Sequence, residues 1–451
     1  MEFLLGILNF ISNLGSTVMV PVMITIVGLV LGLDFFKALK AGMTVGIGLI
    51  GINLVMNLVW NYMTPVANAL VELFNLNLKY IDMGWSYVSA VAFSTTVGTF
   101  VIPFCLLINI VMLVIKATKT VDIDIWNYWH CAFCGSVVYA TTQNYAIAFM
   151  AAGIHFVATL IMGDRFAKVV QEEMDLPGVA ISHGSAAPAL VIGWLANKFL
   201  DLFSKGDKEG GNKDTGKIAA NPFIRFISDP MMVGLILGTV LALIVGSGVA
   251  GSLQTGMAMA ALMFLLPRMV KVLMEGLLPL STAAKKTMAK KFSGQEFFIG
   301  MDSAICLGHP TALSTSLVLI PITLVIAMIL PGNTVLPLGD LASTAYYTAM
   351  TTIPSRGKFG RTLFGATIVQ ALACYAGTYF ADATTQVAVA TGLAEAGAQV
   401  SSLSATWMDV VVHFVASFGW VGFGILAAAT VALLLWHRSW VLKQAPVTEE
   451  E

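Results

Sequence analysis

The sequence predicts an all-α polytopic membrane protein with about 11 transmembrane helices, built as an inverted repeat of five helices with re-entrant hairpins. Composition, recurring apolar segments of span length and a repeat within the chain support this fold class. Hydrophobic residues make up 57% of the 451 residues and charged residues 11%, with a mean hydropathy of +0.84. Soluble domains carry roughly 25% charged residues, so the composition excludes that class. The net charge of −1 gives no indication of nucleic-acid binding.

Apolar segments of roughly 17–25 residues, the length that a bilayer requires, recur along the chain. They lie at about 16–33, 41–62, 98–116, 127–143, 145–162, 221–247, 251–272, 313–330, 334–352, 362–382 and 407–435. The segments 63–97, 176–198, 273–312 and 384–405 are too polar or too rich in glycine for ordinary spans. The first segment, Glu2–Gly15, is apolar on one face and interfacial, and no cleavable signal peptide is expected before it.

The hydrophilic stretch Lys205–Lys217 is the clearest divider of the chain. We therefore expect a first inverted repeat at 1–200 with a re-entrant segment at 176–198, and a cytoplasmic linker at 201–220. A second repeat follows at 221–405 with a re-entrant segment at 294–312, and residues 406–451 form the last transmembrane helix and a cytoplasmic tail.

Basic residues predict the orientation of the chain. They cluster at Lys37/Lys40, Lys116/Lys119, Arg165/Lys168, Lys205–Lys217, Lys285–Lys291, Arg356–Arg361 and Arg438/Lys443. Two expected spans, or none, separate each cluster from the next, so all of them fall on one face. The positive-inside rule makes that face cytoplasmic. The N-terminus is then outside and the C-terminus inside.

The two halves share a sequence repeat. Gly42-Met43 and Pro65 recur as Gly256-Met257 and Pro279, each 214 positions further on (42 to 256 and 65 to 279). An odd number of spans in each half requires the halves to lie in opposite orientations. Inverted repeats are typical of transporters whose site lies near the midplane, where broken helices from both halves meet.

The segment Gly294–Thr311 carries the strongest functional signal. It places Gln295, Glu296, Asp302 and His309 directly before a long apolar span. Polar side chains at membrane depth are costly and by default mark a substrate or ion pathway. Its repeated glycines break a spanning helix, and irregular backbone is tolerated at depth only inside protein or beside a cavity. We expect a re-entrant hairpin that presents Asp302 to a solute.

A second polar break, Leu176–Lys198, contains Ser182, His183 and Gly184 between apolar flanks. Glycines near His183 favour a hairpin tip over a packed helix interior. Trp85 is interpreted either as an aromatic platform for a sugar face or as a belt tryptophan, and His130 either as a ligand contact or as an interfacial residue. The residues expected to bind substrate are Asp302, His183, Gly184, Ser182, His130, Trp85, Ser86, Glu296, Gln295, His309 and Asp340.

Other histidines and the cysteines have simpler interpretations. His155 and His413 lie in regular spans and are expected to pack or bond between helices, whereas His437 is placed in the tail. Cys131 and Cys134 form a C-x-x-C one helical turn apart, which is more typical of small apolar packing residues than of a metal site. No metal, cofactor or catalytic residue is expected in this chain.

Taken together, these motifs carry a family resemblance. GQEFFIGMDSAICLGHPTALS, the SHG of residues 182–184, VDIDIWNYWH at 121–130 and LPGNTVLPLGDLA at 330–342 resemble the galactitol-type enzyme IIC, the membrane subunit of a sugar phosphotransferase system related to the ascorbate enzyme IIC. The resemblance implies a homodimer in the bacterial inner membrane, with a core domain that holds the sugar and moves against a dimerisation domain. It also implies partner subunits IIA and IIB, which pass phosphate from phosphoenolpyruvate, and a IIB cysteine that phosphorylates the sugar.

A polyol is neutral, so its site needs carboxylates, imidazoles and amides rather than a clamp of charges. An ion-coupled transporter with Asp302 or Glu296 as its proton site is the first alternative, and a membrane-embedded enzyme or channel the second. The basic segment with Lys285, Lys286, Lys290 and Lys291 is interpreted either as an anchor in lipid headgroups or as a docking surface for the phosphorylated IIB partner.

Overall fold

The structure is a computed structural model that describes residues 16–73, 77–122, 124–203, 226, 229–291 and 297–444. In this part of the chain, seven helices are long and apolar enough to cross a membrane, in agreement with a polytopic membrane protein. They lie at Phe35–Val55, Thr96–Val114, Tyr145–Met174, Gly248–Leu280, Pro310–Ile329, Phe359–Ala390 and Trp420–Lys443. Residues Glu2–Gly15, most of the linker at 201–220 and the end of the tail lie outside the described residues.

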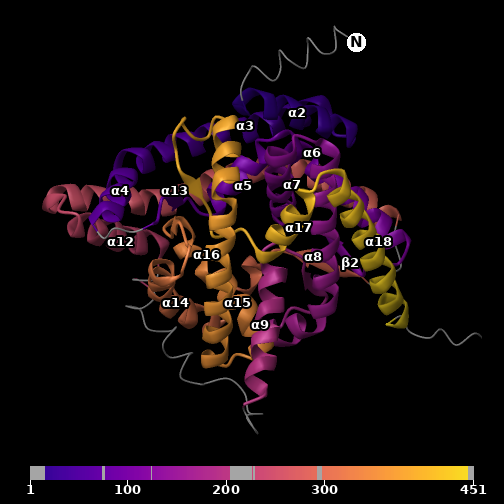
Figure 1. Cartoon of the computed structure of the whole chain (residues 1–451). Coiled ribbons are helices and arrows are strands. Elements are labelled where there is room, and N and C mark those ends of the chain that lie inside the picture. Colours follow the sequence, from indigo (N-terminus) through magenta and orange to yellow (C-terminus); the bar gives the residue numbers. More distant parts are fainter. Residues whose placement is uncertain are drawn as a thin grey trace, which may run out of the picture.

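One group of helices packs together at one side of the molecule (Figure 1). It consists of α2 (Ser16–Val30), α3 (Phe35–Leu58), the π-helix η1 (Val59–Met63), α4 (Thr64–Leu73), α12 (Pro230–Ile244) and α13 (Gly248–Lys291). Glycine lets α3 and α13 approach closely, because a Cβ at Gly48 would lie 2.7 Å from the backbone nitrogen of Leu273. Thus α3 from the first half of the chain packs directly on α13 from the second.

The remaining helices form a larger group around α16, with α18 on the opposite side from α4 and α12 (Figure 1). Its helices are α5 (Trp85–Phe93), α6 (Thr96–Val114), α7 (Trp129–Thr142), α8 (Tyr145–Met174), α9 (Ala186–Asp201), α14 (Pro310–Ile329), α15 (Thr344–Ser355), α16 (Phe359–Ala390), α17 (Trp407–Ala416) and α18 (Trp420–Lys443). Local signals define several ends. Asn144 caps α8 through its side chain, and Thr406 with Asp409 forms a capping box at α17.

Short strands between these helices form two parallel sheets. The strands are β1 (Tyr80–Asp82), β2 (Thr120–Asp122), β3 (Val179–Ile181), β4 (Phe298–Met301), β5 (Val335–Leu336) and β6 (Val400–Ser401). One sheet has the order β5-β1-β6 and the other β2-β4-β3. Ile81 pairs with Leu336 and Val400, and Ile299 pairs with Val121 and Val179. Each sheet therefore has a central strand from one half of the chain and outer strands from the other.

The structure corrects two of the expected spans. Residues 334–352 are β5, the short 3₁₀ helix η4 (Gly339–Ser343) and part of α15, which has only 12 residues. Residues 407–435 are divided between α17 and α18, because Gly419 has a φ of 63° and turns the backbone between them. The interpretation of His437 as a tail residue is also wrong, since it lies within α18 and is buried.

Two polar segments are also more helical than expected. The helix α13 continues through Pro267 and Pro279 to Lys291, and α16 continues to Ala390. The two expected re-entrant segments each contain a strand that is followed by a helix. In the first, β3 precedes α9, and in the second, β4 and the 3₁₀ helix η3 (Ser303–Cys306) precede α14.

Candidate functional site

Helix N-termini from both halves of the chain converge on a small cavity. Trp85 begins α5, Trp129 begins α7, Ser185 precedes α9, and Ser343 precedes α15. Asp302 caps η3 at the same place. The lining residues are Trp85, Trp129, His183, Ser185, Asp302, Ser343, Tyr346, Tyr347 and Ser404. The cavity has a volume of about 30 Å³, and it brings together three of the predicted site residues, Asp302, His183 and Trp85.

Asp302 and His183 face each other across this cavity. One carboxylate oxygen of Asp302, Oδ1, accepts hydrogen bonds from the Ala304 backbone at 2.9 Å and the Ser303 hydroxyl at 3.1 Å. The other, Oδ2, lies 3.9 Å from Nε2 of His183. Because the Ser185 backbone donates to Nδ1 of His183 at 3.4 Å, the neutral ring carries its hydrogen on Nε2. Asp302 and His183 therefore offer an acceptor and a donor to one ligand.

His130 lies directly behind His183. Its ring centroid is 4.9 Å from that of His183, and the side chain is fully buried. Neither ring nitrogen has a hydrogen-bond partner among the residues that the structure describes. The predicted site residue Gly184 makes this packing possible, because a Cβ there would lie 2.7 Å from Cγ of His130.

A second buried pair continues the row of imidazoles. The ring of His155 is stacked on that of His130, with centroids 6.3 Å apart and planes inclined by 7°. Its Nε2 atom lies 3.0 Å from Oδ1 of Asp409, although the two groups lack the alignment of a hydrogen bond. On the other side of the ring, Nδ1 of His155 is 3.7 Å from Sγ of Cys131 on α7, so His155 bonds between helices, as expected. His413 does so too, through Thr141 at 2.8 Å and Tyr379 at 2.9 Å.

Polar groups at the end of β2 and in the short segment after it support the wall of the cavity. Asn127 donates to Oδ1 of Asp122 at 2.7 Å and to the hydroxyl of Ser182 at 3.2 Å. Asp124 accepts a hydrogen bond from the backbone nitrogen of Asp302 at 3.1 Å and so fixes the start of η3. Burial raises the pKa of Asp122 to about 7 and raises the pKa of Asp124 as well, because it disfavours the charged carboxylate.

Other predicted residues have different environments. The carboxylate of Asp340 is buried and accepts bonds from the Trp85 backbone at 2.8 Å, the Ser402 hydroxyl at 2.8 Å and the Ser404 hydroxyl at 3.0 Å. It therefore anchors the start of α5 from behind the cavity.

Ser86 is buried within α5, and His309 caps α14 with Nε2 3.7 Å from Oε1 of Glu173. Neither of them lines the cavity. Gln295 and Glu296 lie outside the described residues.

Several lining residues were not predicted from the sequence. They are Trp129, Ser185, Ser343, Tyr346, Tyr347 and Ser404. The position of Trp129 next to His130, and of Ser185 next to Gly184, was a usable signal. Tyr346, Tyr347 and Ser404 follow no polar break that marks them in the sequence.

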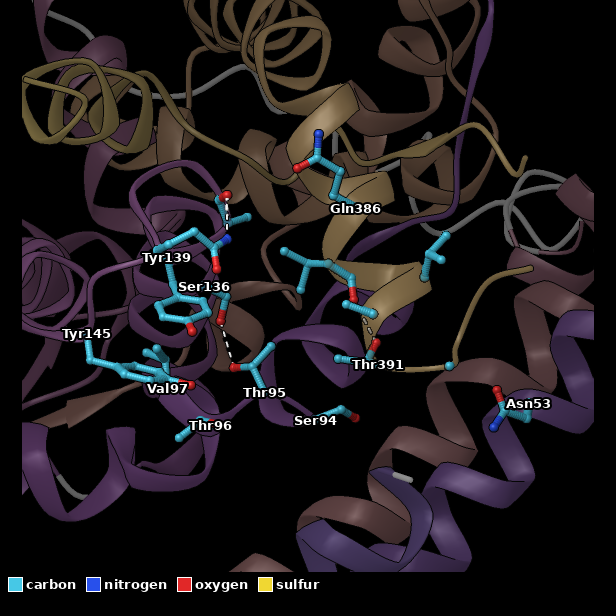
Figure 2. A pocket seen from close by; sticks show the side chains of 16 residues that line it. Asn53, Ser94, Thr95, Thr96, Val97, Ser136, Tyr139, Tyr145, Gln386 and Thr391 are labelled. Atoms are coloured by element: carbon cyan, nitrogen blue, oxygen red, sulfur yellow. Dashed lines mark hydrogen bonds between the residues drawn. The ribbon is translucent and has the colours of Figure 1, made fainter. Parts of the chain in front are cut away.

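A much larger cavity lies at the opposite ends of α5 and α7. Its volume is about 730 Å³, and it is lined by residues that include Asn53, Thr95, Ser136, Tyr139 and Gln386. Figure 2 shows these side chains around it. Trp85 and Trp129 begin α5 and α7, whereas Ser94 and Gln143 are the C-terminal caps of the same helices, so the two cavities are separated along them.

The sequence matches a known protein family over residues 9–397, described as EIIC-GAT, PTS system sugar-specific permease component. The chain belongs to this family. It is 34% identical over 440 residues to a PTS system galactitol-specific EIIC component of Escherichia coli strain K12, with 96% of each chain covered. A putative permease IIC component of the same strain is 36% identical over 433 residues, which are 95% of this chain and 98% of the relative.

Membership of this permease family confirms the resemblance seen in the sequence. The protein is a multi-pass sugar permease of the phosphotransferase system in the bacterial inner membrane, and IIA and IIB subunits are its partners. Within the described residues no group of three or more His, Cys, Asp and Glu side chains is arranged to hold a metal ion.

Proposed function

We propose that this permease translocates a sugar alcohol similar to galactitol, bound at the cavity between Asp302 and His183, for phosphorylation by a partner IIB subunit. The observation that carries the proposal is the mixed lining of that cavity. It combines one carboxylate, one imidazole, three serine hydroxyls and four aromatic side chains, with no lysine or arginine. Two relatives are named as galactitol-specific permeases, and they match 96% of this chain.

The chemistry of these groups suits a neutral polyol. Every hydroxyl of an alditol both donates and accepts a hydrogen bond, and a carboxylate with a neutral imidazole offers both complements. Trp85 and Trp129 add apolar surface to the lining, which suits the carbon chain of an alditol. Less hydroxylated analogues are then rejected, because they leave buried polar groups without partners.

Binding requires the site to open. A cavity of about 30 Å³ has room for roughly one water molecule, which is far less than a hexitol occupies. The lining comes from both halves of the chain, since Trp85 and His183 precede the linker and Asp302 and Tyr346 follow it. Small displacements of these segments therefore change the cavity directly.

Phosphorylation also needs a partner. All five cysteines are buried, so none is placed to carry a phosphoryl group, and the phosphocysteine is supplied by IIB. When the alditol oxygen bonds to phosphorus, the sulfur–phosphorus bond breaks and the hydroxyl loses its proton. Asp302 lines the cavity and is the candidate to receive that proton, whereas the neutral ring of His183 already carries its hydrogen on Nε2.

We also propose that the two halves are an inverted repeat, with the C-terminus cytoplasmic and the N-terminus outside. The sheets support the repeat, because β5-β1-β6 becomes β2-β4-β3 when each half is exchanged for the other. Contacts between basic clusters support the orientation. Arg356 pairs with Glu172 at 3.1 Å near Lys168, and the guanidinium of Arg165 lies 4.2 Å from the ring of Trp436, near Arg438.

The assembly of the permease is part of this proposal. We propose a homodimer in which the group containing α2, α3, α12 and α13 provides the contact between subunits and the group around α16 holds the sugar. Many large apolar side chains on α3, α12 and α18 are exposed, and they suit contact with lipid or with a second subunit. A functional monomer in mild detergent, measured by light scattering together with transport, contradicts this assembly.

Calorimetric titration of galactitol into purified protein tests the site. Asp302→Asn keeps the shape of the side chain and removes its charge. A hydrogen bond to a charged group contributes about 1.5–3 kcal/mol, so affinity is expected to fall roughly ten- to hundredfold. His183→Ala should weaken binding similarly, and the double variant should show coupling between the two residues.

Asp382→Asn is the matched control, because Asp382 is exposed on α16 and does not line the cavity. It should bind galactitol as the parent does. If Asp302→Asn also binds as tightly as the parent, the placement of the site is wrong. In vesicles, uptake should require phosphoenolpyruvate with IIA and IIB and should survive a protonophore, whereas an ion-coupled transporter shows the opposite behaviour.

A further inference from the structure

We propose that the large cavity at the far ends of α5 and α7 is a second, weaker binding site for the same neutral polyol. We call it the outer vestibule and define it by Asn53, Thr95, Ser136, Tyr139, Tyr145 and Gln386. This inference rests on the proposed function, because the ligand is the alditol that the permease carries. The vestibule binds the polyol before it reaches the site at Asp302.

The lining of the outer vestibule selects an uncharged ligand. Its residues include serine, threonine, asparagine, glutamine and tyrosine, and none is an aspartate, glutamate, lysine or arginine. An ion or a phosphorylated sugar finds no countercharge in such a lining. A polyol matches it, because hydroxyl and amide groups exchange hydrogen bonds in both directions.

Tyrosine rings provide the apolar surface that a polyol also needs. Tyr139 and Tyr145 are stacked, with ring centroids 4.1 Å apart and planes inclined by 18°. Tyr145 is 42% exposed, so part of its ring remains available to a ligand. The stack comes from two helices joined by a short connection, which holds it in place before any ligand binds.

Polar groups surround this stack from several helices (Figure 2). The hydroxyls of Thr95 and Ser136 bond to each other at 2.8 Å, and Thr95 also accepts a bond from the Gly98 backbone at 2.9 Å. In Figure 2, Asn53 on α3 lies across the cavity from the tyrosines, and Gln386 on α16 lies on a third side. Each of these two amides offers two donor hydrogens and one acceptor oxygen.

The size and position of the vestibule distinguish it from the site at Asp302. A volume of about 730 Å³ lies in the range of roughly 300–1,000 Å³ that is usual for small-molecule sites. The helix α5 has 9 residues and is about 14 Å long, which sets the separation of the two sites. Phe133 on α7 packs edge-to-face on Phe380 of α16 with centroids 5.5 Å apart, in the segment of α7 between Trp129 and Ser136. One ligand therefore cannot occupy both sites.

The vestibule also lies on the face expected to be outside. The basic residues Arg165 and Lys168 are near the C-terminal end of α8, and Tyr145 is at its N-terminal end. Arg361 is near the start of α16, and Gln386 is near its end. If the basic ends are cytoplasmic, the vestibule faces the extracytoplasmic solution from which the alditol arrives.

Fluorine NMR of purified protein with fluorotyrosine at position 139 or 145 tests the inference. Galactitol should shift both signals in a saturable manner, with a midpoint at least tenfold above the calorimetric Kd of the site at Asp302. The shift should persist in Asp302→Asn, because that variant weakens only the inner site. Fluorotyrosine at Tyr375, which is exposed on α16 and does not line the vestibule, should show no saturable shift.

Asn53→Ala and Gln386→Ala should each raise the midpoint of the fluorine shift several-fold and leave the calorimetric Kd of the inner site unchanged. Calorimetric binding without a saturable shift, or a shift that neither variant alters, overturns the vestibule site and leaves the proposed function intact. If the parent protein shows neither calorimetric binding nor a shift, both the proposed function and the vestibule fail. Because two independent alanine variants and the parent are measured, misfolding of one variant does not decide the outcome.

Discussion

Nε2 of His437 lies 2.9 Å from Oδ2 of Asp164, and both side chains are fully buried. The same carboxylate accepts bonds from the hydroxyls of Thr118 and Thr120, each at 2.7 Å. On the other side of the imidazole ring, Nε of Arg165 is 3.3 Å from Nδ1 of His437. These contacts attach α18 to α8 and to the strand that carries Asp122.

His437→Ala is therefore expected to destabilise the protein. Removing the imidazole leaves a buried carboxylate with one partner fewer, which costs about 1–3 kcal/mol. The measurement is the midpoint temperature of unfolding in detergent. Ser439→Ala is the control, since the Ser439 hydroxyl bonds to the Trp436 carbonyl in an exposed position on the same helix. Equal midpoints for the two variants would show that the buried pair contributes nothing.

Asp122 should make stability depend on pH. Its pKa is raised by burial from 3.8 to about 7, so the folded protein holds the proton more tightly than the unfolded chain does. The stability that this proton contributes is complete below pH 3.8 and is lost as the pH rises through 7.

Asp122→Asn removes this dependence and keeps an acceptor for Asn127. The midpoint temperature of the variant relative to the parent should rise between about pH 5 and pH 8. Glu395→Gln, at an exposed position, should have the same midpoint temperature as the parent at every pH. A constant difference between Asp122→Asn and the parent would be the contrary result.

Gly184→Ala should disturb the row of histidines. The added Cβ would lie 2.7 Å from Cγ of His130 and 2.9 Å from Cε1 of His155, so these rings have to move. Overpacking of this kind costs about 1–3 kcal/mol. Gly308→Ala provides the control, because nothing lies within 4 Å of a Cβ at that position. Unfolding midpoint and galactitol affinity should both fall in Gly184→Ala and stay near the parent values in Gly308→Ala.

Cysteine labelling in intact cells tests the orientation. Asp201 is the last residue of α9, at its expected cytoplasmic end, and Glu395 follows the expected outer end of α16. Both residues are exposed. The native cysteines are buried and should give little background. A membrane-impermeant thiol reagent should label Glu395→Cys and should reach Asp201→Cys only after the membrane is opened. Labelling of both positions in intact cells would contradict the proposed orientation.

Sequence reasoning predicted the polytopic fold and the pairing of Asp302 with His183. Polar residues between glycines inside an apolar chain are a strong signal, because their burial is costly unless they have a function. Sequence reasoning did not predict that residues 334–352 form a strand and a short helix. An apolar run that is buried in protein has the same composition as one that faces lipid, so the pattern alone does not separate the two.

The interpretation of the carboxylates had a similar limit. Asp302 and Asp340 both follow glycine-rich segments, yet Asp302 faces the cavity and Asp340 holds the backbone of Trp85. The difference depends on hydroxyls of Ser402 and Ser404, which lie far away in the sequence. Tyr346 and Tyr347 carried no signal either, because tyrosine is enriched at both membrane interfaces whether or not it binds a ligand.

The exchange of strands between the two sheets has a consequence for how the protein is made. While the ribosome is still synthesising the second half, β1 has no neighbours and β2 and β3 lack the strand that joins them. Unpaired strand edges pair readily with other chains, and contacts between distant segments form slowly. A chain that stops at the linker is thus left with incomplete sheets. We expect such a fragment to aggregate or to be degraded by quality-control proteases, and not to act as a permease.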